Sequence, residues 1–87
     1  MPDLTSLPNI GNKLASKLEA AGITNSEELQ RLGSVEAVLR VTGRQPLNGY
    51  NMLYAVEGAI RGVRWQSISR EELYLLRHAY DRATDHD

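Results

Sequence analysis

Apolar side chains recur at helical spacing near the start of the chain. Four of them follow one another at intervals of four, four and three residues, which places them on one face of an α-helix: Ile10, Leu14, Leu18 and Ala21. The pattern predicts a first helix over Gly11–Ala21. Gly22 follows at once and supplies the left-handed conformation that commonly ends a helix.

Two short helices are predicted next, over Ser26–Leu32 and Val35–Thr42. Asn25 can cap the first of them, and Glu28 stands three residues later, as in a capping box. Ser34 is expected to cap the second helix through its side chain. A glycine follows each helix, which favours a stop at both places.

The two longest predicted helices occupy the second half of the chain. Asn48 is expected to cap the first of them, Gly49–Arg61. Ser69 and Glu72 form a capping box at the start of the second. Residues 84–87 have nothing to bury and are expected to fray. The apolar stripe of the last helix consists of Leu73, Leu76, Tyr80 and Ala83.

No stretch alternates apolar and polar residues for long enough to form a strand, so the expected fold consists of five short helices. The 87 residues are enough for one core and too few for two. We therefore predict a single all-α domain over residues 1–87, a small bundle that begins with a helix-hairpin-helix-like motif. Because the chain has no cysteine, packing must stabilise it without disulfides.

Composition also bears on location and partners. No stretch resembles a membrane span or a secretory signal, so we expect a soluble, cytoplasmic protein with no membrane partner. A net charge of −1 argues against general DNA coating, which depends on neutralising phosphates. Residues 29–70 nevertheless hold six arginines against two glutamates, between two acidic flanks. This segregation has two interpretations, an arginine-rich face for an acidic partner or charge complementarity between helices.

The run Leu-Pro-Asn-Ile-Gly at residues 7–11 is typical of the turn in a helix-hairpin-helix, whose backbone amides commonly grip a nucleic-acid phosphate. Pro8 fixes one backbone torsion and Gly11 permits a torsion that most residues cannot adopt, so a rigid turn should lead into the first helix. Free amides at a helix N-terminus attract anions. The predicted phosphate clamp consists of Gly11, Asn12 and Lys13, with Lys17 one turn further along.

Asn9 stands where the phosphate-gripping turn has its first glycine. Asparagine tolerates the left-handed conformation better than other non-glycine residues, so the shape of the turn can survive. Its side chain is expected to obstruct close approach to the backbone, and the alternative interpretation is a turn that only lets two helices pack. If DNA is bound, we expect phosphate contacts with little sequence readout. The arginines expected to contribute are Arg40, Arg44 and Arg64.

A second set of residues indicates a protein partner. Gly58 lies inside a predicted helix, where it costs about 1 kcal/mol relative to alanine, so something should compensate. With its small neighbours it would let another helix, or Trp65, approach closely. The predicted partner interface consists of Tyr50, Tyr54, Gly58 and Trp65. It defines the alternative function, a protein-protein interaction or self-association domain, including a homo-oligomer, that binds no nucleic acid.

Residues with catalytic potential are sparse. Glu57 is placed for an ion pair with Arg61, and no second acid or base stands at helical spacing from it. Neither His78 nor His86 has another ligand at the spacing of a metal site on a helix face. The motifs of phosphate-binding loops, dinucleotide folds and serine hydrolases are absent as well. We predict no enzyme and expect no cofactor, metal or small-molecule substrate.

Five short motifs follow one another between about Leu4 and Tyr80: Leu-Pro-Asn-Ile-Gly, Leu-x-x-Ala-Gly-Ile, Leu-x-x-Leu-Gly-Ser-Val-Glu-Ala, Tyr-Ala-Val-Glu-Gly-Ala-Ile-Arg-Gly and Trp65. In this order and spacing they closely resemble the C-terminal domain of TfoX-type competence regulators. The resemblance implies an all-helical domain with a helix-hairpin-helix-like start. It also makes Asn9 typical of the family.

The resemblance has implications for function as well. TfoX regulators act with an activator of the cyclic-AMP receptor type to turn on DNA-uptake genes, and they carry an N-terminal α/β domain in addition to this one. We therefore expect a non-enzymatic module of transcription and competence regulation that binds DNA weakly or binds a regulatory protein.

Overall fold

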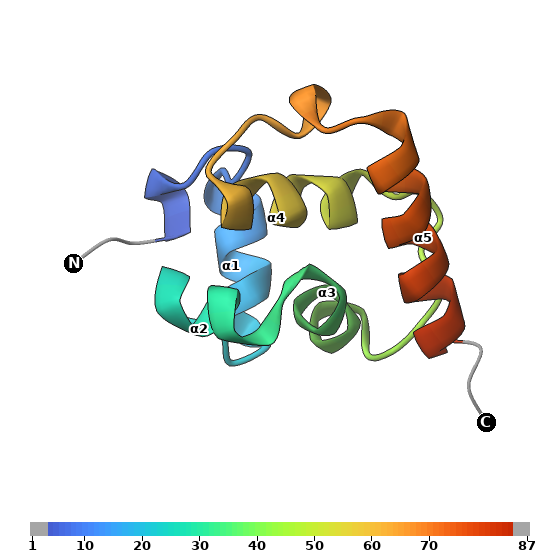
Figure 1. The fold of residues 1–87 in the computed structure, drawn as a ribbon. Helices are drawn as coiled ribbons and strands as arrows, with labels where there is room; N and C mark the ends of the chain where they lie inside the picture. The colour runs from blue at the N-terminus through green and yellow to red at the C-terminus, as the bar shows by residue number, and fades with distance from the viewer. Residues whose placement is uncertain (1–3, 85–87) are drawn as a thin grey trace.

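Five α-helices and two short 3-10 turns follow one another along residues 4–84, the part of the chain that the computed structural model describes (Figure 1). In chain order they are η1 (Leu4–Ser6), α1 (Asn12–Ala20), α2 (Ser26–Leu32), α3 (Ser34–Thr42), α4 (Asn51–Arg61), η2 (Trp65–Ser67) and α5 (Arg70–Thr84). No strand occurs among these residues, which confirms the predicted all-α class. Thr84 is helical, and the rest of the tail expected to fray lies outside the described residues, as does His86.

Local sequence signals set most of the helix ends. The backbone N–H of Glu28 donates to Asn25 Oδ1 at 2.8 Å, and that of Glu72 donates to Ser69 Oγ at 3.2 Å, so both of these predicted caps are confirmed. α3 ends at Gly43 as predicted, and this glycine adopts the left-handed conformation that a side chain would strain.

Two other predicted caps are wrong. Ser34 is the first residue of α3 and not its cap, and its buried hydroxyl donates to Glu57 on α4. α4 begins at Asn51, two residues later than predicted, and Asn48 does not cap it. Tyr50, directly before this helix, is hydrogen-bonded to α5 instead. In both places a contact with a distant helix takes precedence over the local capping signal.

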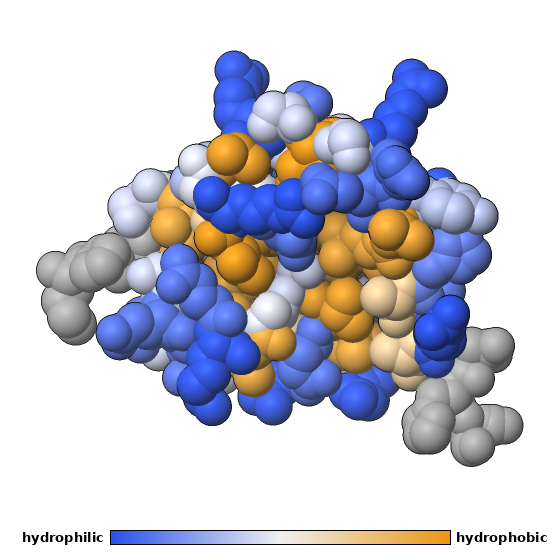
Figure 2. All heavy atoms as spheres, in the orientation of Figure 1, coloured by the Kyte–Doolittle hydropathy of each residue, from blue (hydrophilic) through white to orange (hydrophobic). Residues whose placement is uncertain are grey.

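α3 lies at the centre of the molecule and contacts each of the other four α-helices. Figure 1 shows α1 and α2 to one side of it, α5 to the other and α4 above it. Apolar surface still shows between the helices in the space-filling view (Figure 2). Burial of apolar side chains from all five helices and from the loop after α1 stabilises this arrangement. The fully buried residues include Leu18, Ile23, Leu29, Val38, Leu53, Val56 and Tyr80.

Tyr80 joins α5 to the loop between α3 and α4. It is completely buried, and its hydroxyl donates to the carbonyl oxygen of Gln45 at 2.7 Å and lies 2.8 Å from Thr42 Oγ1. A buried hydroxyl is costly unless it is hydrogen-bonded, and this one has two partners. Polar contacts therefore add to apolar packing in holding the last helix.

Candidate functional site

In the hairpin turn at residues 7–11, Asn9 and not Gly11 adopts the left-handed conformation. Asn9 has a φ of 69°, whereas Gly11 has a φ of −94° and a ψ of −174°, an ordinary extended backbone. The prediction that Gly11 supplies the unusual torsion is therefore wrong, because the left-handed residue of the turn is Asn9, two residues earlier. α1 starts directly after Gly11, and among residues 4–84 no side chain caps its first backbone N–H groups.

The side chain of Asn9 points toward α4 and toward the connector between α4 and α5, residues 62–69. Its Nδ2 donates to the carbonyl oxygens of Val63 at 2.9 Å and Ala55 at 3.4 Å. Its Oδ1 accepts from the backbone N–H of Trp65 at 3.3 Å. These bonds fix the hairpin to the connector. Because the side chain is directed into the molecule, it does not stand over the turn as expected from the sequence.

Gly58 makes room for this contact. A β-carbon at residue 58 would lie 2.5 Å from Asn9 Nδ2, 2.8 Å from the carbonyl oxygen of Val63 and 3.0 Å from the backbone nitrogen of Trp65. The predicted close approach of Trp65 to this glycine thus occurs through the Trp65 backbone. Gly58 is buried beneath the hairpin, so it is not part of a surface that a partner could reach.

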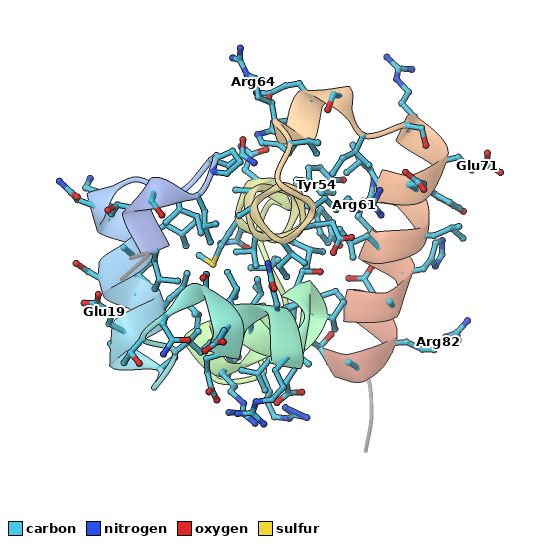
Figure 3. All side chains as sticks on the ribbon, turned by 60° about the vertical axis from the view of Figure 1, so that its left-hand side comes forward. Glu19, Tyr54, Arg61, Arg64, Glu71 and Arg82 are labelled. Carbon is cyan, nitrogen blue, oxygen red and sulfur yellow. The ribbon has the colours of Figure 1, made fainter. Side chains whose placement is uncertain are left out.

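Arg64 stands beside the hairpin, because it lies between the two connector residues that Asn9 holds. Its side chain is exposed and extends away from the molecule (Figure 3). Lys13, in the first turn of α1, is also exposed and makes no ion pair within residues 4–84. Cations beside an uncapped helix start provide a setting that favours anions. We refer to Gly11, Asn12, Lys13 and Arg64 as the hairpin edge.

The other cations predicted to contact phosphate lie elsewhere. Lys17 is one turn further along α1, where it borders a hollow of about 350 Å³ beside α3 and α4. Arg40 and Arg44 both lie near Glu36, with nitrogen–oxygen separations of 3.0 and 3.7 Å. The ribbon views place α3 on the opposite side of α4 from the connector that carries Arg64 (Figures 1 and 3). The structure therefore separates Arg40 and Arg44 from the hairpin edge, and Glu36 offsets part of their charge.

Tyr50, Tyr54 and Trp65 form a continuous aromatic row along α4. The ring centroids of the two tyrosines are 6.3 Å apart, and those of Tyr54 and Trp65 are 5.3 Å apart. The guanidinium of Arg77 lies 4.6 Å from the centre of the Tyr50 ring. The hydrogen bond from the Tyr50 hydroxyl to Asp81, aided by desolvation, raises the pKa of Tyr50. Three of the four predicted interface residues are thus brought together.

A hollow of about 420 Å³ adjoins the aromatic row where α4 meets α5. Tyr74, which lines it, is 56% exposed, and Leu75, the next residue of α5, is 61% exposed. The sequence reasoning missed this surface because it followed only the apolar stripe of the last helix. The sequence did contain a signal for it: two large apolar residues, Tyr74 and Leu75, stand outside that stripe on an otherwise polar face of the helix. The lining residues are Tyr54, Arg70, Glu71, Leu73, Tyr74 and Arg77.

Glu57 links three helices. Its carboxylate accepts a hydrogen bond from Ser34 Oγ at 2.6 Å and pairs with Arg61 at 2.7 Å, which confirms the predicted ion pair. Arg61 also contacts Glu72 on α5 at 2.9 Å, and Figure 3 shows its side chain between α4 and α5. Hydrogen bonds to Glu57 and then Glu72 raise the pKa of the Arg61 guanidinium. Glu57 lines neither of the two hollows described above.

Within residues 4–84, no three histidine, aspartate or glutamate side chains gather closely enough to share a metal ion. None of the helices over the same range has the length and apolar character needed to span a membrane. What this part of the chain does present is an uncapped helix start with two cations and an aromatic row with two arginines. Both features suit the binding of an anionic partner.

Comparisons with known proteins identify one family and solved structures of similar fold. A family model described as the TfoX C-terminal domain matches residues 1–80. An uncharacterized protein from Listeria monocytogenes, crystallised in a triclinic form, is 36% identical with a TM-score of 0.84, over 97% of this chain and 96% of that one. A protein of unknown function from Listeria monocytogenes, in a tetragonal form, is 35% identical with a TM-score of 0.81, over 91% and 98%. No curated protein matches the chain.

Proposed function

This chain belongs to the TfoX C-terminal domain family, and from that premise we propose that it is a non-enzymatic, cytoplasmic module of transcription regulation that binds DNA weakly through its hairpin edge. One observation carries the proposal. The side chain of Asn9 binds Val63 and Trp65, so Arg64 lies in a segment that is fixed to the hairpin leading into α1.

A DNA phosphate at this edge would meet three kinds of donor. The first backbone N–H groups of α1, near Gly11 and Asn12, carry partial positive charge. Lys13 and Arg64 add two full charges from neighbouring segments. Two such cations neutralise about two phosphates, so the logarithm of affinity should fall with the logarithm of salt concentration at a slope of about −2. Contacts of this kind read no bases, which makes the expected binding weak and insensitive to sequence.

Fluorescence anisotropy with a labelled DNA duplex tests this proposal. We expect binding at low salt, and we expect Lys13→Ala combined with Arg64→Ala to weaken it roughly tenfold. The matched control is Arg40→Ala combined with Arg44→Ala, which removes the same charge far from the hairpin edge and should change the affinity little. Absence of binding at low salt, or an equal loss in both double variants, would rule out the hairpin edge as the DNA site.

The hollow beside the aromatic row supports a second candidate function, the binding of an acidic regulatory protein. Tyr74 is 56% exposed beside Arg70 and Arg77, and exposed aromatic and arginine side chains are typical of interface centres. A pull-down after nuclease treatment separates the two candidates. A protein partner held at this surface should be lost with Tyr74→Ala and retained when Lys13 and Arg64 are both replaced. Nuclease-sensitive capture would favour DNA.

A further inference from the structure

α5 has a second face, opposite the one that packs against the core. Glu71, Leu75, His78 and Arg82 follow one another at intervals of four, three and four residues, and all four are exposed. Figure 3 shows Glu71 and Arg82, near the two ends of the helix, both extending away from the rest of the molecule. Leu75, between them, is 61% exposed. A large apolar side chain thus stands in a line bounded by opposite charges.

The intervals of this line are those of the seam between two paired helices, where four-residue and three-residue steps alternate. Neither Glu71 nor Arg82 makes an ion pair with any other residue of the range 4–84. Glu72, next to Glu71 in sequence, is by contrast paired with Arg61 of the same chain. The outer charges therefore remain available for a second chain.

The order of the charges selects the orientation of that chain. If two copies of α5 lie parallel, Glu71 faces Glu71 and Arg82 faces Arg82, and like charges oppose each other at both ends. If they lie antiparallel about a two-fold axis that passes between Leu76 and Arg77, Glu71 of one copy faces Arg82 of the other. Leu75 then lies against His78 of the second copy. Because the arrangement is two-fold, each contact occurs twice.

We propose that this face pairs with α5 of a second copy of the chain in the antiparallel register. The residues on either side of this line also fit the antiparallel register. Tyr74, whose ring meets His78 edge-on at 4.4 Å, lies opposite the small side chain of Ala79 in the second copy. The proposal does not rest on DNA binding, because it uses no residue of the hairpin edge.

The pairing is expected to be weak. α5 has 15 residues and is therefore about 22 Å long, which limits the area that one pair of helices can bury. Such an area lies at or below the lower end of the range found for stable protein interfaces. The dimer should therefore form in a concentration-dependent way and exchange rapidly.

Sedimentation velocity over a concentration series reaching about 1 mM tests the proposal. We expect the wild type to move from monomer toward dimer as concentration rises. Glu71→Arg alone and Arg82→Glu alone should each raise the dissociation constant roughly tenfold, because each creates two like-charge contacts. The double variant Glu71→Arg with Arg82→Glu should recover the wild-type constant, because the pairs are then reversed. Only the antiparallel register predicts this recovery of the dissociation constant, because only there does residue 71 of one copy face residue 82 of the other.

Two controls make the result interpretable. Glu19→Arg makes the same charge change on α1, on the far side of the molecule from α5, and should leave association unchanged (Figure 3). Leu75→Asp should prevent association while circular dichroism shows an unchanged helical fold, since this side chain is exposed. A wild type that stays monomeric throughout, or a double variant that associates no better than the single ones, overturns the proposal. Loss of association in the Lys13 and Arg64 double variant would also contradict it.

Discussion

The side chain of Asn9 lies against Gly58, in space that a β-carbon at residue 58 would need. Asn9 Nδ2 lies 2.5 Å from the position of the missing atom. The two residues are far apart in sequence, yet the Asn9 side chain explains why residue 58 is a glycine, and this glycine makes room for Asn9. A glycine in the middle of a helix is unfavourable by itself, and an asparagine with positive φ is uncommon. Together they let the hairpin dock on α4 through side-chain hydrogen bonds.

Gly58→Ala should therefore destabilise the protein, although alanine is the better helix former by about 1 kcal/mol. The added methyl group would collide with Asn9 and with the carbonyl oxygen of Val63, and backbone cannot move aside easily. We expect a net loss of about 1–3 kcal/mol in the free energy of unfolding, measured by urea denaturation. Gly11→Ala is the control, because a β-carbon there has no neighbour within 4 Å. A Gly58→Ala protein as stable as wild type would contradict this account.

Replacing Asn9 separates the backbone role of this residue from its side-chain role. Asn9→Gly removes the hydrogen bonds to the connector but suits the φ of 69°. Asn9→Ala removes the same bonds and in addition strains the backbone, so it should be less stable than Asn9→Gly by about 1 kcal/mol. Thermal or urea unfolding of both variants measures the difference. Equal stability of the two would show that the left-handed backbone at this position carries no cost.

The parts of the fold that could be predicted from the sequence are those set by residues close together along the chain. Asn25 caps α2, and Gly43 ends α3, as predicted, because capping chemistry and backbone freedom act within a few residues. Three members of the predicted stripe of α5 also face the core, since helical spacing places them on one side: Tyr80 is fully buried, and Leu76 and Ala83 pack against the core. The fourth, Leu73, lines the hollow beside α4 instead.

The parts that sequence reasoning missed depend on contacts between distant segments. Ser34 satisfies the local rule for a cap, yet its hydroxyl donates to Glu57 on another helix. The inward direction of the Asn9 side chain likewise depends on one acceptor within α4, and on one acceptor and one donor that follow α4 in the chain. The separation of Arg40 from Arg64 is also a property of the packed helices and not of their spacing in sequence. For the candidate site, the residue types could be predicted from the sequence. Which of these residues lie close together became clear only from the folded structure.

Ser34→Ala should be coupled to changes at Glu57, because the serine hydroxyl donates to this carboxylate, whose side chain is only 18% exposed. Removing the donor should cost about 1–2 kcal/mol and leave little further effect of Ser34→Ala once Glu57→Ala is present. Asn25→Ala removes a helix cap on α2 at a cost of about 1 kcal/mol and should add independently to Glu57→Ala, because no hydrogen bond within residues 4–84 links Asn25 to Glu57. Two urea-based double-mutant cycles compare Ser34 with Asn25. Additive behaviour at Ser34 would show that its bond to Glu57 contributes nothing.

Tyr50 should lose its proton at a higher pH than an ordinary tyrosine. Its hydrogen bond to Asp81, with desolvation and the charge of the carboxylate, raises its pKa above 10.0. The unfolded chain releases this proton first, so the contribution of Tyr50 to stability is complete below about pH 10 and declines as pH rises through the folded-state pKa. Difference absorbance titration against Tyr50→Phe measures the value, and Asp81→Asn should lower it. A Tyr50 titration unchanged by Asp81→Asn would contradict the assigned cause.

Tyr80→Phe should show how much the buried hydroxyl of α5 contributes. The substitution preserves the ring that fills the core and removes only the group that donates to the Gln45 carbonyl oxygen at 2.7 Å and contacts Thr42 Oγ1 at 2.8 Å. The fully buried ring would lose both hydrogen bonds, so we expect a loss of about 1–2 kcal/mol in urea unfolding. Tyr74→Phe makes the same change at a position that is 56% exposed and should stay within about 0.5 kcal/mol of wild type. If the two variants unfold alike, packing of the Tyr80 ring alone holds α5 against the loop between α3 and α4.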